Sequence, residues 1–414
     1  MAKKENRHAE LVSASANIEA PYELPDGWKW CRLPECVSIV TGKKDANYGT
    51  PDGKYLFFTC AEQPLRCDDY SFEGESLLLP GNGANVGQVI YYDGQFEVYQ
   101  RTYVLQKIIE SFSLKYLYYH ILGFWENYNH DKQYGSATNY IKMGNFLNYI
   151  FPLPPTLAEQ QRIVNRIETM FEKLDQAQEK VQAVLDSFET RKAAILHKAF
   201  SGQLTANWRK KNGVSDDSWE EKTVGDCCTS LKYGTAKKSE SSGKVAVIRM
   251  GNLQHGEIEY DDLVFSNDEE DIKKYSLSKG DVLFNRTNSP EWVGKTSIYR
   301  GDIPAIYAGY LIKLDYIKTM LIGDYLNYML NSPNAKEYCN SVKTDGVNQS
   351  NINAQKIGAY EIPVPSLSEQ QEIVRILDTV LEKEFRAKEA AQTVLDQIAL
   401  LKKSILARAF RGEL

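Results

Sequence analysis

The sequence is poor in the residues from which metal sites and hydrolytic centres are built. It contains 5 histidines and 7 cysteines in 414 residues. The cysteines include no Cys-x-x-Cys pair and no histidine partner at metal-ligand spacing, and the adjacent Cys227 and Cys228 cannot easily chelate one ion together. The scattered histidines offer no Ser-His-Asp triad. These absences argue against a metal site and a triad hydrolase, and they favour a reduced, cytoplasmic protein.

Long apolar runs are also missing. No stretch reaches the roughly 20 residues that a membrane-spanning helix needs, and the polar first residues do not resemble a signal peptide. Aromatic residues make up 11% of the chain, which is enough for folded cores, and 25% of the residues are charged. The net charge is −6. An isolated DNA-binding domain is normally basic, so this acidity indicates either no nucleic-acid ligand or local basic patches within a larger complex.

Catalytic loops are absent too. An adenine amino-methyltransferase needs an Asn/Asp-Pro-Pro-Tyr/Phe loop. Residues 289–292 lack the second proline of this motif, and residues 153–156 lack both its first polar residue and its final aromatic residue. The glycine-rich residues 81–87 have neither GxGxxG spacing nor the Lys-Ser/Thr of a P-loop, and they predict a polar turn. Acidic runs at 261–262 and 269–271 are typical of a solvated face. The sequence therefore predicts a protein without catalytic activity of its own.

What the sequence does contain is a long repeat. Residues 159–204 recur as residues 369–414 at a constant offset of 210 residues, and 21 of the 46 aligned positions are identical. A larger segment precedes each copy. We delimit the chain as an N-terminal tail (1–23), a first head (24–155), a first helix (156–204), a linker (205–214), a second head (215–365) and a second helix (366–414).

Both copies of the repeat have the pattern of a coiled-coil helix. Apolar residues step by four and three along residues 163–195 and again along residues 373–405, which is a period near 3.5. Each helix should run about 40 residues, or about 60 Å at 1.5 Å per residue. Matched seams of equal length predict that the two helices pair with each other. Two independent surface helices are the alternative.

Two charged residues occupy seam positions. Arg191 stands in the first seam, and Glu384 interrupts the second at the position where the first copy has Leu174. We expect the neighbouring Phe385 to take over the contact that Glu384 cannot make.

The heads share a plan that is weaker than the helix repeat. Each begins with a tryptophan before a short strand, Trp28 and Trp219, and each ends in an amide- and hydroxyl-rich loop that leads to proline. Alternating aliphatic residues predict strands, and longer periodic runs predict short helices. The predicted strands are 76–79, 245–248 and 282–284, and the predicted helices are 114–125 and 322–330. We therefore expect small α+β heads.

This combination resembles the specificity (S) subunit of type I restriction-modification systems. The resemblance covers nearly the whole chain and rests on the helix entries at residues 153–164 and 362–374 and on the helix ends AILHKAFSGQL and SILARAFRGEL. It implies an α+β fold in which two target recognition domains alternate with two long helices. The helices would pair as an antiparallel coiled coil with a pseudo-two-fold internal repeat.

The resemblance also implies partners. Each head would read one half of an asymmetric bipartite site in double-stranded DNA, with the helix pair setting the spacer. Two adenine methyltransferase (M) subunits would dock on the chain, and restriction (R) subunits would join through them. No cofactor is expected on this chain, since S-adenosylmethionine, ATP and magnesium would be used by the partner subunits. The tail, residues 1–22, is expected to complete the helix end at Leu414 in a quasi-circular arrangement, because Leu204 continues into further chain.

Polar loop residues are the candidates for reading bases. Arginine and lysine suit guanine, and asparagine and glutamine suit adenine, although such residues also form ordinary turns. In the first head the candidates are Lys43, Lys44, Asn82, Asn85, Ser136, Thr138, Asn139 and Lys142. In the second head they are Lys237, Arg249, Asn252, Asn285, Arg286, Asn288, Lys295, Lys343, Asn348, Gln349 and Asn351.

The outward faces of the helices are the candidates for docking the methyltransferase. Because each seam should be covered by the other helix, the remaining charged faces are left for partners. The candidates are Arg162, Glu168, Lys173, Lys192, Glu372, Asp378, Lys383 and Lys402. A coiled-coil scaffold with two protein-binding heads stays open as an alternative function. Self-contained catalysis is opposed by the missing motifs.

Overall fold

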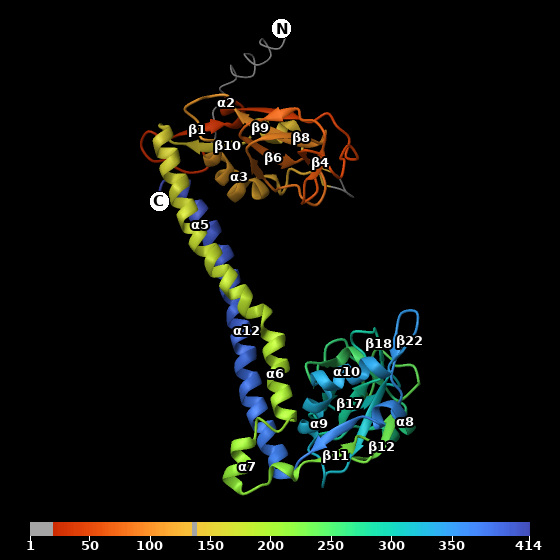
Figure 1. Cartoon of the computed structure of the whole chain (residues 1–414). Coiled ribbons are helices and arrows are strands. Elements are labelled where there is room, and N and C mark those ends of the chain that lie inside the picture. Colours follow the sequence, from red (N-terminus) through yellow and green to blue (C-terminus); the bar gives the residue numbers. More distant parts are fainter. Residues whose placement is uncertain (1–19, 135–138) are drawn as a thin grey trace. The chain divides into compact units, whose positions relative to one another are not determined.

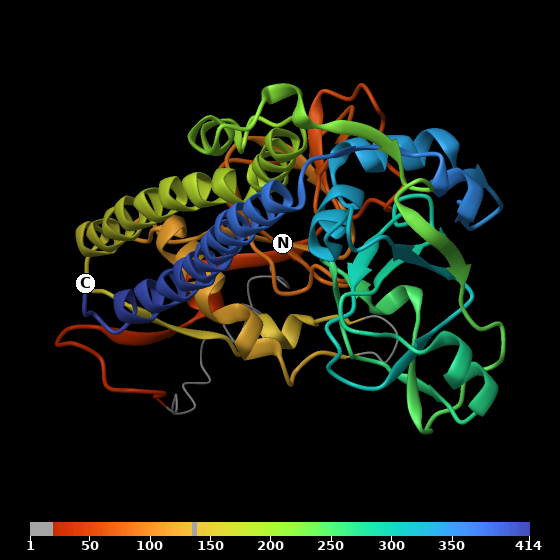
Figure 2. The ribbon, with the colours of Figure 1, turned by 90° about the horizontal axis from the view of Figure 1, so that it is seen from below.

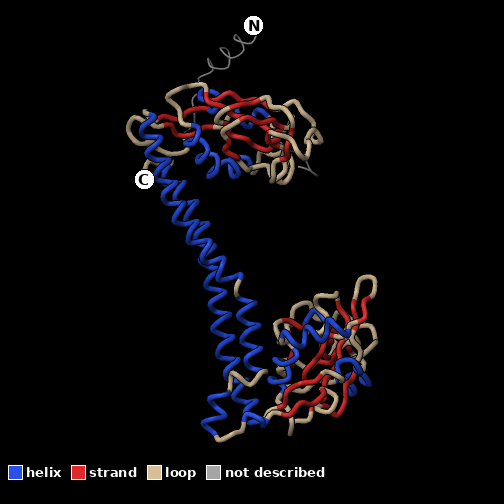
Figure 3. The backbone as a smooth tube through the Cα atoms, viewed as in Figure 1, coloured by secondary structure: helices blue, strands red, loops and turns tan. Residues whose placement is uncertain are grey.

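The computed structural model describes residues 20–134 and 139–414, and these fold as two compact units. Unit 1 combines the residues up to Gln182 with Thr393–Leu414, and unit 2 is Ala183–Gln392. The strands of each unit gather in its head, whereas the long helices carry none (Figure 3). None of the described helices combines the length and the apolarity needed to cross a membrane.

The first head is built on two four-stranded sheets. The antiparallel sheet has the order β2 (Val37–Thr41), β9 (Thr102–Lys107), β6 (Ser76–Pro80), β7 (Ile90–Tyr92). The mixed sheet has the order β4 (Leu65–Cys67), β3 (Tyr55–Phe58), β8 (Gln95–Val98), β5 (Phe72–Glu73), in which β3 and β8 are parallel. The remaining elements are β1 (Lys29–Arg32), which pairs with β10 (Ile150–Leu153), and the helices α2 (Leu33–Cys36), α3 (Leu114–Asn129) and α4 (Met143–Leu147).

The second head has three sheets and a terminal strand pair. Its largest sheet has the order β12 (Cys228–Tyr233), β21 (Leu311–Tyr316), β17 (Val282–Asn285), β19 (Thr296–Ile298), β15 (Glu257–Ile258), β14 (Leu253–Gln254). One three-stranded sheet has the order β16 (Val264–Ser266), β13 (Val245–Ile248), β20 (Ala305–Tyr307). The other has the order β18 (Thr287–Asn288), β23 (Ser350–Asn351), β22 (Thr344–Asp345). The terminal pair is β11 (Glu220–Thr223) with β24 (Glu361–Val364). The helices of this head are η1 (Asp216–Ser218), η2 (Met250–Asn252), α8 (Glu269–Tyr275), α9 (Gly323–Leu330), α10 (Pro333–Val342) and α11 (Ala354–Gly358).

The strand orders of the two heads match. The run β2-β9-β6-β7 corresponds to β12-β21-β17-β19, and the parallel pair β3 and β8 corresponds to β13 and β20. All five elements predicted from periodicity are present, as β6, β13, β17, α3 and α9. The short strand after each opening tryptophan is present as β1 and β11.

One helix of each head packs between the head sheet and the long helices. In unit 1 the core joins Leu77 of β6, Leu117 of α3, Ile163 of α5 (Leu157–Asp186) and Phe410. In unit 2 an equivalent core joins strands β17 and β21, helix α9, helix α6 (Phe188–Phe200) and the start of α12 (Leu367–Ala409). These apolar cores hold each head on its helices.

A buried glutamine fastens each head to its helix by bonds to the backbone. The Oε1 of Gln160 accepts from the backbone N–H of Ser113 (2.8 Å), and the Oε1 of Gln370 accepts from that of Ile322 (2.9 Å). Each side-chain amide also donates to a head carbonyl. Both glutamines are almost fully buried. The attachment therefore does not depend on the head's own side chains at these positions.

The first long helix is interrupted, contrary to the expectation of one continuous helix. Helix α5 ends at Asp186 and α6 begins at Phe188. The carbonyl of Val184 accepts a hydrogen bond from the Ser187 hydroxyl (2.9 Å) and one from the Arg191 guanidinium (3.3 Å). Side-chain donors thus compete with the helical N–H for this carbonyl, a known cause of helix distortion. Helix α12 continues without interruption through the equivalent region.

The helices are antiparallel neighbours within each unit. In unit 1, Lys402 of α12 pairs with Asp175 of α5 at 2.5 Å, and α12 lies beside α5 in both views (Figure 1, Figure 2). In unit 2, Arg191 of α6 pairs with Glu384 of α12 at 2.8 Å. The expectation for Phe385 is wrong: its side chain is 53% exposed, because Glu384 stays in the contact and meets the other charged seam residue.

Four further seam predictions fail. Val184, Ala387, Val394 and Leu401 are exposed. In this stretch of α12, Lys402 rather than Leu401 lies against α5, where its Nζ also approaches the ring of Phe171 (5.8 Å). A lysine can pack its aliphatic stem in such a contact while its ammonium pairs with a carboxylate. The spacing of apolar residues alone could not predict that Lys402, rather than Leu401, contacts α5.

The start of the described chain packs on the end of α12. The Tyr22 hydroxyl donates to the carbonyl of Phe410 at 2.8 Å, and the guanidinium of Arg411 lies 5.6 Å from the centre of the Tyr22 ring. This contact agrees with the expected closure between the tail and the helix end for Tyr22. The rest of the expected closure falls on residues 1–19, outside the described residues.

Candidate nucleic-acid interface

The second head carries a small platform formed by β18, β23 and β22. Strand β17 of the main sheet runs directly into β18, so the platform continues a buried strand to the surface. Strands β22 and β23 form a hairpin whose turn is closed by a hydrogen bond from the N–H of Gly346 to the carbonyl of Gln349 (2.7 Å). Val347 at the tip is 98% exposed. A projecting hairpin of this kind can enter a DNA groove.

Arg286 lies at the centre of this platform. Its guanidinium donates to the Gly309 carbonyl and to the Asn351 side chain, both at 3.3 Å, and lies 4.8 Å from the centre of the Tyr233 ring. The Asn351 amide donates in turn to Thr287 Oγ1 at 2.7 Å. Both bonds to the guanidinium are long for charge-assisted hydrogen bonds. Arg286 is thus positioned by weak contacts and is able to exchange them for a ligand.

Lys295 and Lys343 lie on loops beside the platform. Lys295 donates to the Gln254 side chain (2.8 Å) and lies 4.0 Å from the centre of the Trp292 ring, and burial lowers its pKa. Lys343 donates to the carbonyl of Pro290, which places the hairpin next to the loop that carries Trp292. The structure thus brings together predicted residues from three separate segments: Arg286, Asn288, Lys295, Lys343, Asn348, Gln349 and Asn351.

Exposed aromatic residues form part of this surface, and the sequence analysis missed them. Trp292 and Tyr310 are each 53% exposed, and Tyr233 is 40% exposed. Tyr310 is adjacent because its carbonyl accepts from the backbone N–H of Arg286. Aromatic faces stack on bases and on guanidinium groups. The usable signal was an aromatic residue beside each predicted cation, as in YGTAKK and SPEWVGK.

The first head has a related arrangement after β6. Asn82 bridges to Tyr140, and Tyr140 bridges to Tyr134, so a loop returns to the end of the strand as β23 does in the second head. The rings of Tyr134 and Tyr140 stack, and Lys142 lies 4.1 Å from the centre of the Tyr134 ring. Asn139 is exposed. The predicted contacts Ser136 and Thr138 fall outside the described residues.

Two predicted base contacts are wrong because their side chains are buried. Asn285 has no exposed surface, and Asn252 is 4% exposed. The Asn252 amide donates to the carbonyls of Glu259 and Asp261, so it organises a turn. Neither amide atom of Asn285 has a hydrogen-bond partner among the described residues. A sequence pattern cannot distinguish a polar residue at the buried end of a strand from a polar residue that is exposed at the surface.

Several predicted cations are already paired with acids. Lys237 pairs with Asp268 (2.7 Å), Arg249 pairs with Asp262 (2.9 Å), and Lys44 pairs with Asp69 (3.3 Å). The amide of Asn85 donates to the carbonyl of Cys60. Lys43 is exposed. Paired cations at the surface can still exchange a carboxylate for a phosphate, since exposed ion pairs are weak.

Two of the predicted docking residues turn towards the heads. Glu168 accepts from Lys115 (2.6 Å) and from the Tyr119 hydroxyl (3.4 Å), and Asp378 accepts from the Tyr328 hydroxyl (2.7 Å). The expectation that these carboxylates face outward is therefore wrong. They strengthen the attachment of α3 to α5 and of α9 to α12.

Two of the predicted docking lysines also fail to face outward. Lys402 pairs across the helices with Asp175, and Lys192 is half-buried, so that burial lowers its pKa. A joint charge reversal at these lysines would disturb folding as well as assembly. Of the four remaining candidates, Lys173 and Lys383 are exposed, and Glu372 pairs locally with Arg375. Arg162 pairs locally with Glu159 and also donates to the carbonyl of Leu414 (2.9 Å).

Comparison with known proteins identifies the family. The family model for the type I restriction modification DNA specificity domain matches the chain twice, at residues 25–185 and 216–395. The chain belongs to the type I restriction-modification DNA specificity family. It is 27% identical over 422 residues to the EcoDI specificity subunit of Escherichia coli, covering 95% of this chain and 90% of that subunit. It is 28% identical to the EcoKI specificity subunit of E. coli K12, covering 68% of this chain and 61% of that one.

Solved structures share the fold of this specificity-family chain. One, from a study of complex assembly and conformational transition of a type I restriction-modification system, has a TM-score of 0.74 at 19% identity and covers 95% of this chain and all of that one. The HsdS subunit from Thermoanaerobacter tengcongensis has a TM-score of 0.60 at 19% identity, covering 96% and 100%. The prediction of a non-catalytic specificity subunit agrees with the relatives, which are named specificity subunits.

Proposed function

We propose that this chain is the DNA-specificity subunit of a type I restriction-modification complex and that it reads an asymmetric, bipartite site. Each head would act as a target recognition domain, with the boundaries 24–155 and 215–365. The observation that carries the proposal is the matched construction of the two units. Each joins a head of the same strand order to a copy of the same helix through the same buried glutamine contact.

The helices are proposed to pair as an antiparallel coiled coil, giving the chain a pseudo-two-fold internal repeat. Ion pairs between antiparallel helices in each unit support this pairing. Half-sites on one face of B-DNA are separated by about 34 Å per helical turn. Helices of about 60 Å, in segments 156–204 and 366–414, would hold two heads across such a spacing.

We assign DNA contact to the exposed polar residues of each head. In the second head these are the platform residues around Arg286, with Lys237 and Arg249 as phosphate ligands. In the first head they are Lys43, Lys44, Asn82, Asn85, Asn139 and Lys142, together with Ser136 and Thr138. The aromatic residues beside the cations would stack on bases or on sugar.

The partners proposed are two adenine methyltransferase subunits, with restriction subunits joining through them. No cofactor is assigned to this chain; S-adenosylmethionine, ATP and magnesium would act in the partners. Because the chain carries a net charge of −6, its own affinity for DNA should be weak and sensitive to salt. Tight binding should require the methyltransferases, which must also flip the adenine out of the stack.

Co-expression with the cognate methyltransferase subunit tests the function. We expect a complex of two methyltransferases to one chain by native mass spectrometry. Sequencing of methylated bases in cells with and without this gene should show one bipartite motif that disappears with it. If the methyltransferase does not bind and the methylation pattern is unchanged, the specificity function is wrong. A coiled-coil scaffold with protein-binding heads would then be the better account.

Arg286 should read one base of the half-site bound by the second head. Replacing it with alanine should relax specificity at a single position, at a cost of about 1–3 kcal/mol for the preferred base. R286K is the matched control, because lysine keeps the charge and loses the bidentate geometry. Binding of the assembled complex to a set of duplexes varied at each position would measure both variants. Equal weakening on every sequence, with a smaller salt dependence, would instead identify Arg286 as a phosphate contact.

A further inference from the structure

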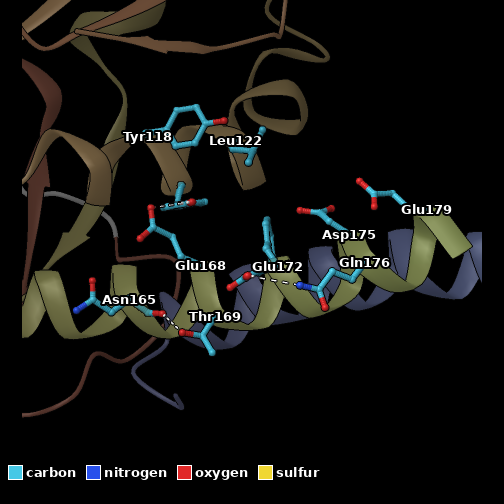
Figure 4. A pocket seen from close by; sticks show the side chains of 11 residues that line it. Tyr118, Leu122, Asn165, Glu168, Thr169, Glu172, Asp175, Gln176 and Glu179 are labelled. Atoms are coloured by element: carbon cyan, nitrogen blue, oxygen red, sulfur yellow. Dashed lines mark hydrogen bonds between the residues drawn. The ribbon is translucent and has the colours of Figure 1, made fainter.

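The tip of the β22–β23 hairpin carries the most exposed large apolar side chain of residues 20–134 and 139–414. Val347 is 98% exposed, and the hairpin projects from the second head at the element labelled β22 in Figure 1. By contrast, Leu122 is 44% exposed and lines the same groove as Tyr118 (Figure 4). Because Val347 contributes almost no burial to folding, its apolar surface is available to a ligand.

The hairpin that carries Val347 is braced on both strands. The Ser350 hydroxyl donates to the Asp345 carboxylate, and the ammonium group of Lys356 on α11 donates to the Thr344 hydroxyl at 2.7 Å. Branching at Cβ also restricts the χ1 angle of a valine. Little conformational entropy would therefore be lost when Val347 meets a ligand, and the contact would be correspondingly favourable.

The residues around this tip suit the edges of bases. Asn348 and Gln349 follow Val347 directly, and both are exposed. Their amides can pair with adenine, and a two-stranded ribbon fits the major groove of B-DNA. Arg286 bonds to Asn351 at the base of the same hairpin. A hairpin that enters the groove with these polar residues would also bring Val347 to the base edges.

The major groove offers an aliphatic side chain one matching group, the C5-methyl of thymine. The other groups that distinguish the base pairs there are hydrogen-bond donors and acceptors, and a valine would desolvate them without replacing their bonds. Packing the isopropyl group of Val347 on a thymine methyl removes apolar surface of both from water. Such a contact would favour thymine over cytosine at one position.

We propose that Val347 is a specificity-determining residue that reads the methyl group of one thymine in the half-site of the second head. The proposal rests on the proposed function and adds an apolar contact to the polar ones assigned above. In the first head, the sequence between the bridged residues Tyr134 and Tyr140 is Gly-Ser-Ala-Thr-Asn, without a branched aliphatic residue. Recognition of a methyl group by a branched side chain at this turn is therefore assigned to one half-site only.

Replacing thymine with deoxyuridine tests the proposal, because it removes the methyl group and leaves the base pairing unchanged. The probe is a duplex carrying the motif identified by sequencing of methylated bases, with each thymine replaced singly. For the complex with methyltransferase, one replacement in the second half-site should weaken binding about fourfold. With V347A the same replacement should have no effect, and the unmodified duplex should already bind about fourfold more weakly. V347I is the matched control, because it keeps a branched apolar side chain and should keep the dependence on the methyl group. Circular dichroism should be unchanged for both variants, since the side chain is almost fully exposed.

Each other outcome has a distinct meaning. A uracil effect that persists in V347A, or no uracil effect at any position, would overturn the assignment and leave the proposed function intact. A rise in 2-aminopurine fluorescence that requires Val347, without a uracil effect, would identify an apolar wedge that unstacks bases instead. Loss of methyltransferase from V347A in the absence of DNA would show that a protein covers the tip. Failure of the unaltered complex to bind the unmodified duplex would count against the proposed function itself.

Discussion

Exchange of residues 215–365 for the second head of another specificity subunit is expected to rewrite one half of the methylated motif and leave the other half unchanged. The exchanged segment contains both strands of the terminal pair, β11 and β24, so the pair is transferred intact. The recipient helix holds the new head through Gln370, whose amide bonds to backbone atoms that every head possesses. The incoming side chains are thus free to differ in the reading loops.

Sequencing of methylated bases in cells that carry the hybrid chain measures this result. The reciprocal exchange of residues 24–155 is the control, and it should change the other half only. A hybrid that altered both halves of the motif would show that the two heads read DNA jointly. A hybrid that lost all methylation while still binding the methyltransferase would point to a head that no longer reaches its half-site.

Removal of Arg209 should destabilise unit 2 by about 3–5 kcal/mol. Arg209 lies on α7 (Ala206–Asn212) and pairs at 2.7 Å with Glu369, which has no exposed surface. The Thr205 hydroxyl donates to the same carboxylate oxygen at 2.6 Å. R209M would leave a buried carboxylate without its cation, and such an uncompensated charge is strongly unfavourable.

The matched control lies in unit 1. Glu159 occupies the position equivalent to Glu369, but it pairs with the exposed Arg162 three residues along the same helix. R162M should therefore cost less than about 1 kcal/mol. Urea unfolding monitored by circular dichroism compares the variants, and R209M/E369M should recover most of the lost stability. Equal effects of R209M and R162M would contradict a buried, structural role for the Arg209 pair.

Secondary structure and the repeat were predictable because they depend on local patterns. Strand β13 and helix α9 follow from the spacing of aliphatic residues. The role of Glu384 was not predictable, because an acidic residue in an apolar seam has no local explanation. Its partner Arg191 lies 193 residues away. Only the antiparallel register of the helices brings the two charges together.

The candidate interface was predictable in composition and only partly in position. Arg286 and Asn351 were identified by residue type, and the structure joins them although they are 65 residues apart. Asn285 precedes Arg286 and looks equally suitable, but the strand has not yet emerged from the core at that residue. The docking residues were least predictable, since Glu168 and Asp378 are bound by tyrosines of the heads.

The pairing of Arg191 with Glu384 also restricts how the chain can fold. Sliding α12 by one heptad along α6 in one direction would set Arg191 against Leu377 and Glu384 against Val184, so that both charges lose their partners. Sliding it in the other direction would set Arg191 against Ala391 and Glu384 against Lys198, so that Arg191 loses its partner. Polar residues at single seam positions specify register in this manner. We infer that the Arg191–Glu384 pair selects one register of α12 against α6. A chain with the wrong register would then be disfavoured during folding, before DNA is bound.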